Sequence, residues 1–116
     1  MEIPEEVKAD VVRLQSLQQK MQSLLVQKQN IQMQVVEIEN ALKELSNKKS
    51  DEAVFEIVGT IMLKKEVGEL EKSLNERKEI FELRLKSYDK QIKSINNDLS
   101  KLQEKIADKL KGKGGK

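Results

Sequence analysis

The sequence of 116 residues contains no cysteine, no histidine and no tryptophan. Without cysteine the chain cannot form a disulfide or use a thiol nucleophile. Without histidine it lacks the commonest general base and the commonest transition-metal ligand. No GxxxxGK[ST] phosphate-binding motif occurs, and no pair of carboxylates falls in a predicted pocket. We therefore expect a protein that is not an enzyme and that uses no metal or cofactor.

Aromatic residues are scarce as well, at 3%, and the hydrophobic fraction of 37% is low for a thick globular core. Lys and Arg number 22 against 20 Asp and Glu, so the net charge of +2 argues against nucleic-acid binding through bulk charge. No apolar run approaches the roughly 20 residues that a membrane span needs, and the acidic start is unlike a secretory signal. We expect a cytoplasmic protein that contacts neither nucleic acid nor membrane.

Helix breakers are few and divide the chain clearly. Pro4 is the only proline, and the glycines lie at 59, 68, 112, 114 and 115. Between these breakers two uninterrupted stretches remain, each long enough for a helix of about 65 Å. The sequence predicts one subunit over 1–116, with helices over about 5–47 and 67–111, a β-hairpin over about 53–64, and a flexible basic tail over 112–116.

Both predicted helices carry a heptad repeat of apolar residues, which is typical of a coiled-coil seam. In each helix nine of the ten core positions are apolar or aromatic, and the tenth is a lysine. The first helix provides Leu14, Leu17, Met21, Leu24, Lys28, Ile31, Val35, Ile38, Leu42 and Leu45. The second provides Leu74, Lys78, Phe81, Leu85, Tyr88, Ile92, Ile95, Leu99, Leu102 and Ile106.

Two helices with matched apolar stripes are expected to pack against each other in antiparallel fashion. The register that pairs the a and d positions throughout sets Leu42 against Phe81, Val35 against Tyr88, Met21 against Leu102 and Leu17 against Ile106. A register shifted by one heptad satisfies the same pattern. Lys28 and Lys78 interrupt the stripe. Such a lysine either specifies the register or partner of the helix, or merely extends its ammonium group into water beside the seam. Tyr88 is expected to be a core residue.

The segment between the helices has a different pattern. Residues 53–58 and 60–64 are rich in β-branched and aromatic side chains and are separated at Gly59, which is typical of a β-hairpin. The alternative is a kinked continuation of helix. A lone two-stranded hairpin is not stable in water, so its apolar side chains and open edges require partners. The predicted fold is therefore mainly α, a long antiparallel two-helix coiled coil joined by a central β-hairpin.

This plan resembles the β-type subunit of archaeal prefoldin, which has one hairpin where α-type subunits have two. The similarity extends over nearly the whole chain. Its most specific part is the hairpin, where an aromatic residue precedes a glycine turn, and the Gln-rich first helix adds to it. The matching stretches are Gln15 to Gln34, Ala41 to Leu45, Val54-Phe55, Val58 to Leu63, and Glu69-Leu70. The opening of the second helix, 65–68, departs from the usual helix start because it lacks an Asp, Asn, Ser or Thr cap.

The resemblance implies an ATP-independent chaperone. Prefoldins are hexamers of two α-type and four β-type subunits, whose hairpins join into a platform from which coiled coils extend. The tips of the coiled coils hold unfolded polypeptides and pass them to a group II chaperonin. Hairpin residues expected to mediate assembly are Val54, Phe55, Ile57, Val58, Ile61 and Leu63.

The chain ends are where the seam is expected to fail. Continuing the heptads places Asp10 and Lys109 at core positions, which leaves nearby apolar residues poorly partnered. Such residues would bind unfolded chains by non-directional apolar contact, although simple fraying of the ends is an alternative. The expected polypeptide-binding residues are Ile3, Val7, Val11, Val12, Leu14, Ile106 and Leu110. The basic tail offers a candidate chaperonin contact or merely a solubilising end, with Lys109, Lys111, Lys113 and Lys116.

Two rival functions remain open at this stage. A structural coiled-coil tether, or a helical bundle like the tubulin cofactors, would have a helical centre and form a monomer or dimer. A basic coiled coil that binds nucleic acid would carry a basic stripe, whereas here charges of both signs are interspersed.

Overall fold

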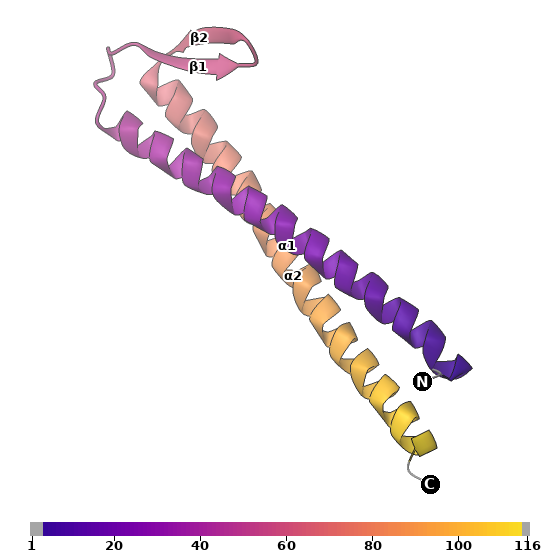
Figure 1. The fold of residues 1–116 in the computed structure, drawn as a ribbon. Coiled ribbons are helices and arrows are strands. Elements are labelled where there is room, and N and C mark those ends of the chain that lie inside the picture. Colours follow the sequence, from indigo (N-terminus) through magenta and orange to yellow (C-terminus); the bar gives the residue numbers. More distant parts are fainter. Residues whose placement is uncertain (1–3, 115–116) are drawn as a thin grey trace. The chain divides into compact units, whose positions relative to one another are not determined.

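A computed structural model describes residues 4–114, with side chains over 4–112. Helix α1 spans Glu5–Ser46 and helix α2 spans Val67–Gly114, and between them lie strands β1, Val54–Val58, and β2, Ile61–Lys65 (Figure 1). The strands form an antiparallel two-stranded sheet. This architecture confirms the predicted fold class, and the alternative of a kinked helix through the centre is wrong.

The helix ends follow from local hydrogen bonding. The Pro4 carbonyl accepts from the amides of Val7 and Lys8 at 2.9 and 3.1 Å, so α1 begins directly after the proline. At the start of α2, the Glu66 carbonyl accepts from the Leu70 amide at 3.0 Å. Acidic side chains in the first turns of both helices favour these starts through the helix dipole.

The far end of α2 differs from the sequence expectation. The helix continues through Gly112 to Gly114, so the prediction of a flexible tail starting at residue 112 is wrong for 112–114. A glycine costs a helix only about 1 kcal/mol relative to alanine, which is a penalty that a long helix tolerates. Residues 115–116 lie outside the described residues.

The chain forms two compact units, which are described separately. The hairpin unit comprises 29–86 and contains both strands with the adjoining parts of the helices. The terminal unit comprises the helix segments up to Lys28 and from Ser87 onward. In both units every core position predicted from the heptads lies buried or half-buried. The most buried of these, at 5–8% exposure, are Leu24, Ile31, Val35, Ile38, Leu45, Ile95 and Leu102.

The register of the helix pair is shifted by one heptad from the one that the sequence favoured. That register would set Asp10 opposite Lys113 and Lys28 opposite Ile95. Instead, Asp10 contacts Lys105 and Lys109, and Lys28 contacts Asp89. The alternative register is therefore correct within the terminal unit. Apolar seam residues repeat every seven positions, so they could not discriminate between the two.

The tight turn of the hairpin depends on Gly59. It has a φ of +62°, and no residue other than glycine has a positive φ in the part of the chain that the structure describes. Gly59 and Thr60 join the paired residues Val58 and Ile61, and a positive φ confined to the first turn residue is the pattern of a type II′ turn.

Candidate interaction surfaces

The hairpin is anchored to the helices by a small apolar core. Val54, at the start of β1, lies in one buried cluster with residues from both helices. Its other members are Ile38, Leu45, Val67, Leu70 and Leu74, with Ala41, Leu42 and Phe81 packed against them. An ion pair of 3.8 Å between Glu56 of β1 and Arg77 of α2 adds a second attachment. The hairpin is thus held at its base.

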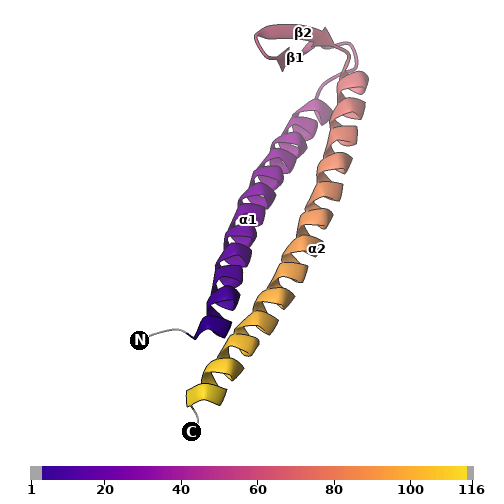
Figure 2. The same cartoon turned by 90° about the vertical axis from the view of Figure 1, so that its right-hand side faces the viewer.

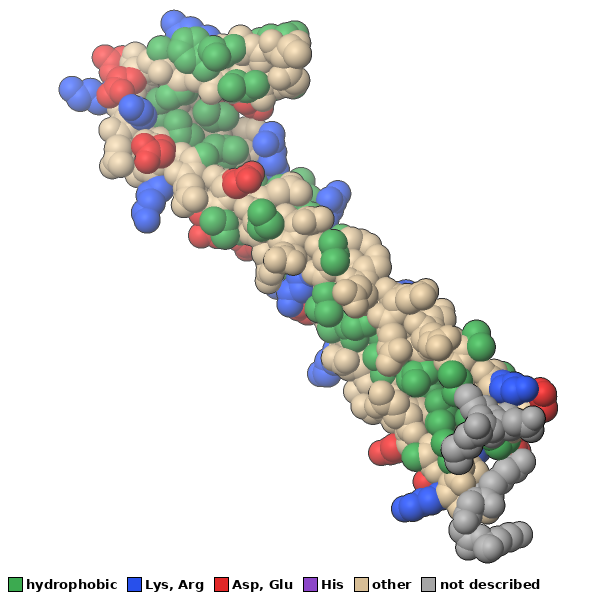
Figure 3. Space-filling model, in the orientation of Figure 1, with side chains coloured by type: hydrophobic (Ala, Val, Ile, Leu, Met, Phe, Trp, Pro, Cys, Tyr) green, Lys and Arg blue, Asp and Glu red, His purple; other side chains and the backbone are tan. Residues whose placement is uncertain are grey.

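Beyond this base the hairpin exposes large apolar side chains, which we call the hairpin surface. They are 43–70% exposed and comprise Phe55, Ile57, Val58, Ile61, Met62 and Leu63. Green side chains are visible over the hairpin in Figure 3. Five of these six residues belong to the assembly set predicted from the sequence. Val54, the sixth predicted member, is buried instead, and Met62 was missed although it stands in the same apolar run.

Both faces of the two-stranded sheet contribute to the hairpin surface. Directly paired residues of antiparallel strands share a face, so Val58 and Ile61 lie on one side and Ile57 and Met62 on the other. Over the residues that the structure describes, the sheet has two strands, so each strand also has one edge without a partner strand. Exposed apolar faces together with open edges are features that a sheet normally covers by pairing with another chain.

An apolar groove adjoins the hairpin surface. Its volume is about 440 Å³, and it lies among the strands and the adjoining helix ends. Apolar lining comes from both helices and both strands, including Leu45, Leu74, Phe55, Ile57 and Met62. The groove extends the apolar surface of the hairpin towards its buried base.

In the terminal unit, α1 and α2 lie side by side (Figure 2) and are joined by a charged cluster. The Asp10 side chain is only 12% exposed, and it accepts a hydrogen bond of 2.8 Å from the Lys109 ammonium. Lys105 lies 3.5 Å from the other carboxylate oxygen. Lys109 also donates to the Glu6 carbonyl at 3.0 Å. We call this arrangement of Asp10, Lys105 and Lys109 the terminal clasp.

The charges of the terminal clasp favour the ionised carboxylate. The hydrogen bond from Lys109 holds the pKa of Asp10 below its ordinary value of 3.8. Partial burial opposes this change, and the positive charge of Lys105 supports it. Asp10 and Lys109 therefore close the seam where the sequence predicted a gap.

This closure changes which apolar side chains are accessible in the terminal unit. Val7 is 1% exposed, so the expectation that it is left poorly partnered is wrong. Val11, Leu14 and Ile106 are half-buried. Val12 at 64% and Leu110 at 44% exposure remain accessible, and Ile3 lies outside the described residues. We call Val12 and Leu110 the terminal apolar pair.

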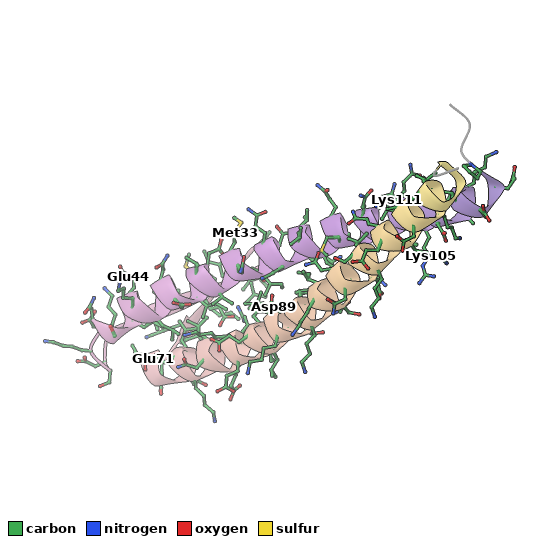
Figure 4. All side chains as sticks on the ribbon, turned by 90° about the horizontal axis from the view of Figure 1, so that it is seen from below. Met33, Glu44, Glu71, Asp89, Lys105 and Lys111 are labelled. Atoms are coloured by element: carbon green, nitrogen blue, oxygen red, sulfur yellow. The ribbon has the colours of Figure 1, made fainter. Side chains whose placement is uncertain are left out.

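The lysines suggested for chaperonin contact have different environments. Lys109 is engaged in the terminal clasp, whereas Lys111 is exposed (Figure 4). The side chain of Lys113 and the whole of Lys116 lie outside the described residues.

The two lysines within the heptad stripe both reach carboxylates. Lys28 lies 2.6 Å from Asp89 on the opposite helix, and Lys78 lies 3.9 Å from Glu82 on its own helix. Tyr88 is half-buried, in keeping with a place in the seam.

Comparison with known proteins decides the family. A model of the prefoldin subunit family matches residues 8–113. The chain belongs to the prefoldin subunit family. Prefoldin subunit beta of Saccharolobus islandicus is 37% identical over 108 residues, which cover 93% of this chain and 86% of that protein. Prefoldin subunit beta of Caldivirga maquilingensis is 35% identical over 115 residues, with 98% and 95% covered.

A solved structure supports the same assignment. The crystal structure of the prefoldin beta subunit from Thermococcus strain KS-1 matches with a TM-score of 0.86 at 33% identity, covering 94% of this chain and 96% of that one. The predicted resemblance to β-type prefoldin is confirmed. The chain is thus a chaperone subunit that forms part of a complex with other prefoldin subunits.

The described residues carry no sign of a membrane span or of a metal site. No helix there is long and apolar enough to cross a membrane. Within the same residues, no group of three or more acidic side chains is placed to hold a metal ion.

Proposed function

We propose that this prefoldin subunit holds unfolded polypeptides without ATP in the cytoplasm and delivers them to a group II chaperonin. In this proposal two separate surfaces have separate tasks. The hairpin surface joins the subunit to α-type subunits and to further copies of itself in a heterohexamer of two α-type and four β-type chains. The terminal apolar pair, with Val11 beside it, contacts the client.

The observation that carries the proposal is the exposure of apolar side chains at the terminal unit of a chaperone-family chain. Val12 and Leu110 expose apolar surface there although the seam around Val7 is closed. Burial of apolar surface contributes about 25 cal/mol per Å² whatever the partner's sequence, so such residues suit clients of any sequence. Weak contacts on several subunits of one complex add through effective concentration.

The structure gives less support to a simple tether. A tether requires a continuous helical centre, whereas 54–58 and 61–65 are strands, and six of their apolar side chains stay uncovered in the single chain. A hairpin of this kind supports a role in an assembly.

The experiment replaces both members of the terminal apolar pair, Val12→Ser and Leu110→Ser, in the assembled complex. The matched control is Leu83→Ser, because Leu83 is an apolar side chain of α2 that is 65% exposed and belongs to the hairpin unit. Aggregation of a chemically denatured model enzyme, followed by light scattering, reports holding. We expect the double variant to assemble but to lose most of its suppression of aggregation, and the control to retain it.

Equal protection by the double variant and the parent would refute capture by these residues. Delivery is tested separately by moving a labelled client from the complex to a group II chaperonin. Lys111→Gln is expected to slow this transfer without changing holding if the exposed lysine contacts the chaperonin.

A further inference from the structure

On α1, the seam of the terminal unit contains two polar core positions among the described residues, Asp10 and Lys28, and both are paired with residues of α2. Asp10 contacts Lys105 and Lys109, and Lys28 contacts Asp89. The Lys28 side chain is 28% exposed and the Asp10 side chain is 12% exposed, so most of the surface of each is buried. A polar residue in a coiled-coil seam costs stability, but it can specify the register.

The apolar residues of α2 do not provide that specificity. A shift of seven residues carries Leu85 to Ile92, Ile92 to Leu99 and Leu99 to Ile106, so apolar partners replace apolar partners. The same shift in either direction preserves most of the apolar burial. Selection of one register must come from residues that differ between successive heptads.

The partners of Asp10 and Lys28 do differ between heptads. Shifted by seven residues one way, Asp10 meets Asp98 and Leu102 in place of its two lysines, and a second carboxylate repels it. Shifted the other way, Asp10 meets Gly112 and Lys116 in place of Lys105 and Lys109, so it keeps only one of its two lysines.

Lys28 gives the complementary restriction. In the shift that brings Gly112 towards Asp10, Asn96 replaces Asp89, so the Lys28 ammonium loses its ionised partner. In the shift that brings Asp98 towards Asp10, Glu82 replaces Asp89 and Lys28 keeps an ionised partner. That shift is opposed by Asp10 alone. The observed register is the one of the three in which Asp10 has two lysines and Lys28 has a carboxylate.

We propose that Asp10 and Lys28 together lock the register of the coiled coil in the terminal unit. The lock keeps Val7 buried and leaves Val12 and Leu110 exposed. It acts on the helix pair itself, and its test does not depend on the binding of clients.

The chain has no cysteine, so engineered disulfides report the register directly. The observed register sets Leu17 opposite Leu99, and the shifted registers set it opposite Ile106 or Ile92. Three versions of the full chain carry Leu17→Cys with Leu99→Cys, Ile106→Cys or Ile92→Cys. Brief mild oxidation and denaturing electrophoresis then give the intrachain cross-link fraction of each. We expect the 17–99 link to exceed the other two by about tenfold or more, since an unpaired buried charge is costly.

The decisive background combines Asp10→Leu with Lys28→Leu. Both changes complete the apolar stripe and remove the two charges that distinguish the registers, so the ratio of shifted to observed cross-links should rise by about tenfold. Asp10→Asn, which keeps the shape and removes the charge, should raise the same ratio to a lesser extent. Lys8→Gln is the control, because it removes an ion pair within α1 and should leave the ratio unchanged.

Charge reversal supplies a rescue. Lys28→Asp alone should raise the proportion of shifted links, and adding Asp89→Lys should restore the parental ratio. A parental ratio in both the double leucine background and the Asp10→Asn background would overturn the proposal.

Discussion

At the scale of single residues, Asp10 shows how a charged side chain can close a helix interface. Its carboxylate is largely withdrawn from water, yet two lysines and the hydrogen bond from Lys109 compensate for that loss. Removing one member of a partly buried ion pair leaves the other charge buried without a partner, which destabilises the fold. The terminal clasp is therefore a site where small changes have large local effects.

The first prediction concerns the pH dependence of the terminal clasp. Because the folded-state pKa of Asp10 lies below its ordinary value, its contribution to stability is fully present above about pH 4 and disappears as the pH falls through the folded-state pKa. Thermal unfolding followed by circular dichroism should give Asp10→Asn a lower midpoint than the parent at pH 7. That difference should vanish at low pH.

The matched control for this prediction is Asp108→Asn, an exposed carboxylate near the same end of α2. Its midpoint should follow the parent at every pH. A difference between Asp10→Asn and the parent that is unchanged at low pH would mean that the charge of Asp10 does not stabilise the fold.

The second prediction concerns Gly59. An added Cβ meets nothing within 4 Å there, so only the backbone conformation limits substitution. Gly59→Ala should destabilise the hairpin by about 1–2 kcal/mol, the cost of a left-handed conformation for an ordinary residue. Amide exchange of β1 and β2 measures this. Gly68→Ala, in the first turn of α2 and equally open, should instead stabilise by up to about 1 kcal/mol. Equal effects of the two changes would contradict the turn geometry.

At the scale of elements, the two helices and the hairpin were predictable because their apolar patterns have different periods. Every heptad position named from the sequence is buried or half-buried, and the β-branched run around Gly59 forms the strands. The register was not predictable from the apolar pattern, because a seven-residue shift maps leucines and isoleucines onto one another. The closed terminal seam does not follow from the apolar pattern, because Asp10 and Lys109 each interrupt the stripe on their own helix, whereas their opposite charges pair across the helices.

The third prediction concerns the packing of the helices at the hairpin. Leu45 is 6% exposed and belongs to the cluster that anchors β1. Leu45→Ala should lower the free energy of unfolding by about 2–5 kcal/mol, since it removes buried contacts and leaves a cavity. Leu83→Ala, at a site 65% exposed, should change it by less than about 0.5 kcal/mol. Chemical denaturation measures both, and similar losses would show that the cluster does not anchor the fold.

At the scale of the whole molecule, the chain leaves apolar surface uncovered at its hairpin and again in its terminal unit. The six side chains of the hairpin surface are too exposed for a protein that functions alone, and two strands are too few for a stable independent sheet. The sequence indicated this requirement for partners, because the apolar run lies in a segment too short to bury itself. The sequence does not specify which chains those partners are, because the hairpin surface consists of apolar side chains whose contacts are non-directional.

The fourth prediction concerns assembly through both faces of the hairpin. Ile57→Asp and Ile61→Asp place one carboxylate on each face of the sheet, where burial against a partner would cost several kcal/mol. The double variant should retain the helical circular dichroism of the parent, because neither residue belongs to the buried cluster. Leu83→Asp, an equally polar change on an exposed position of α2, should leave both helicity and assembly unchanged.

The most direct test is the mass of the complex formed when the chain is mixed with an α-type prefoldin subunit, measured by native mass spectrometry. The account predicts a hexamer of four copies of this chain with two partners for the parent and for Leu83→Asp, and only unassembled chains for the Ile57→Asp, Ile61→Asp variant. A full hexamer formed by that variant, or a parent that stays monomeric beside its partner, would contradict the claim that the hairpin surface assembles the chaperone.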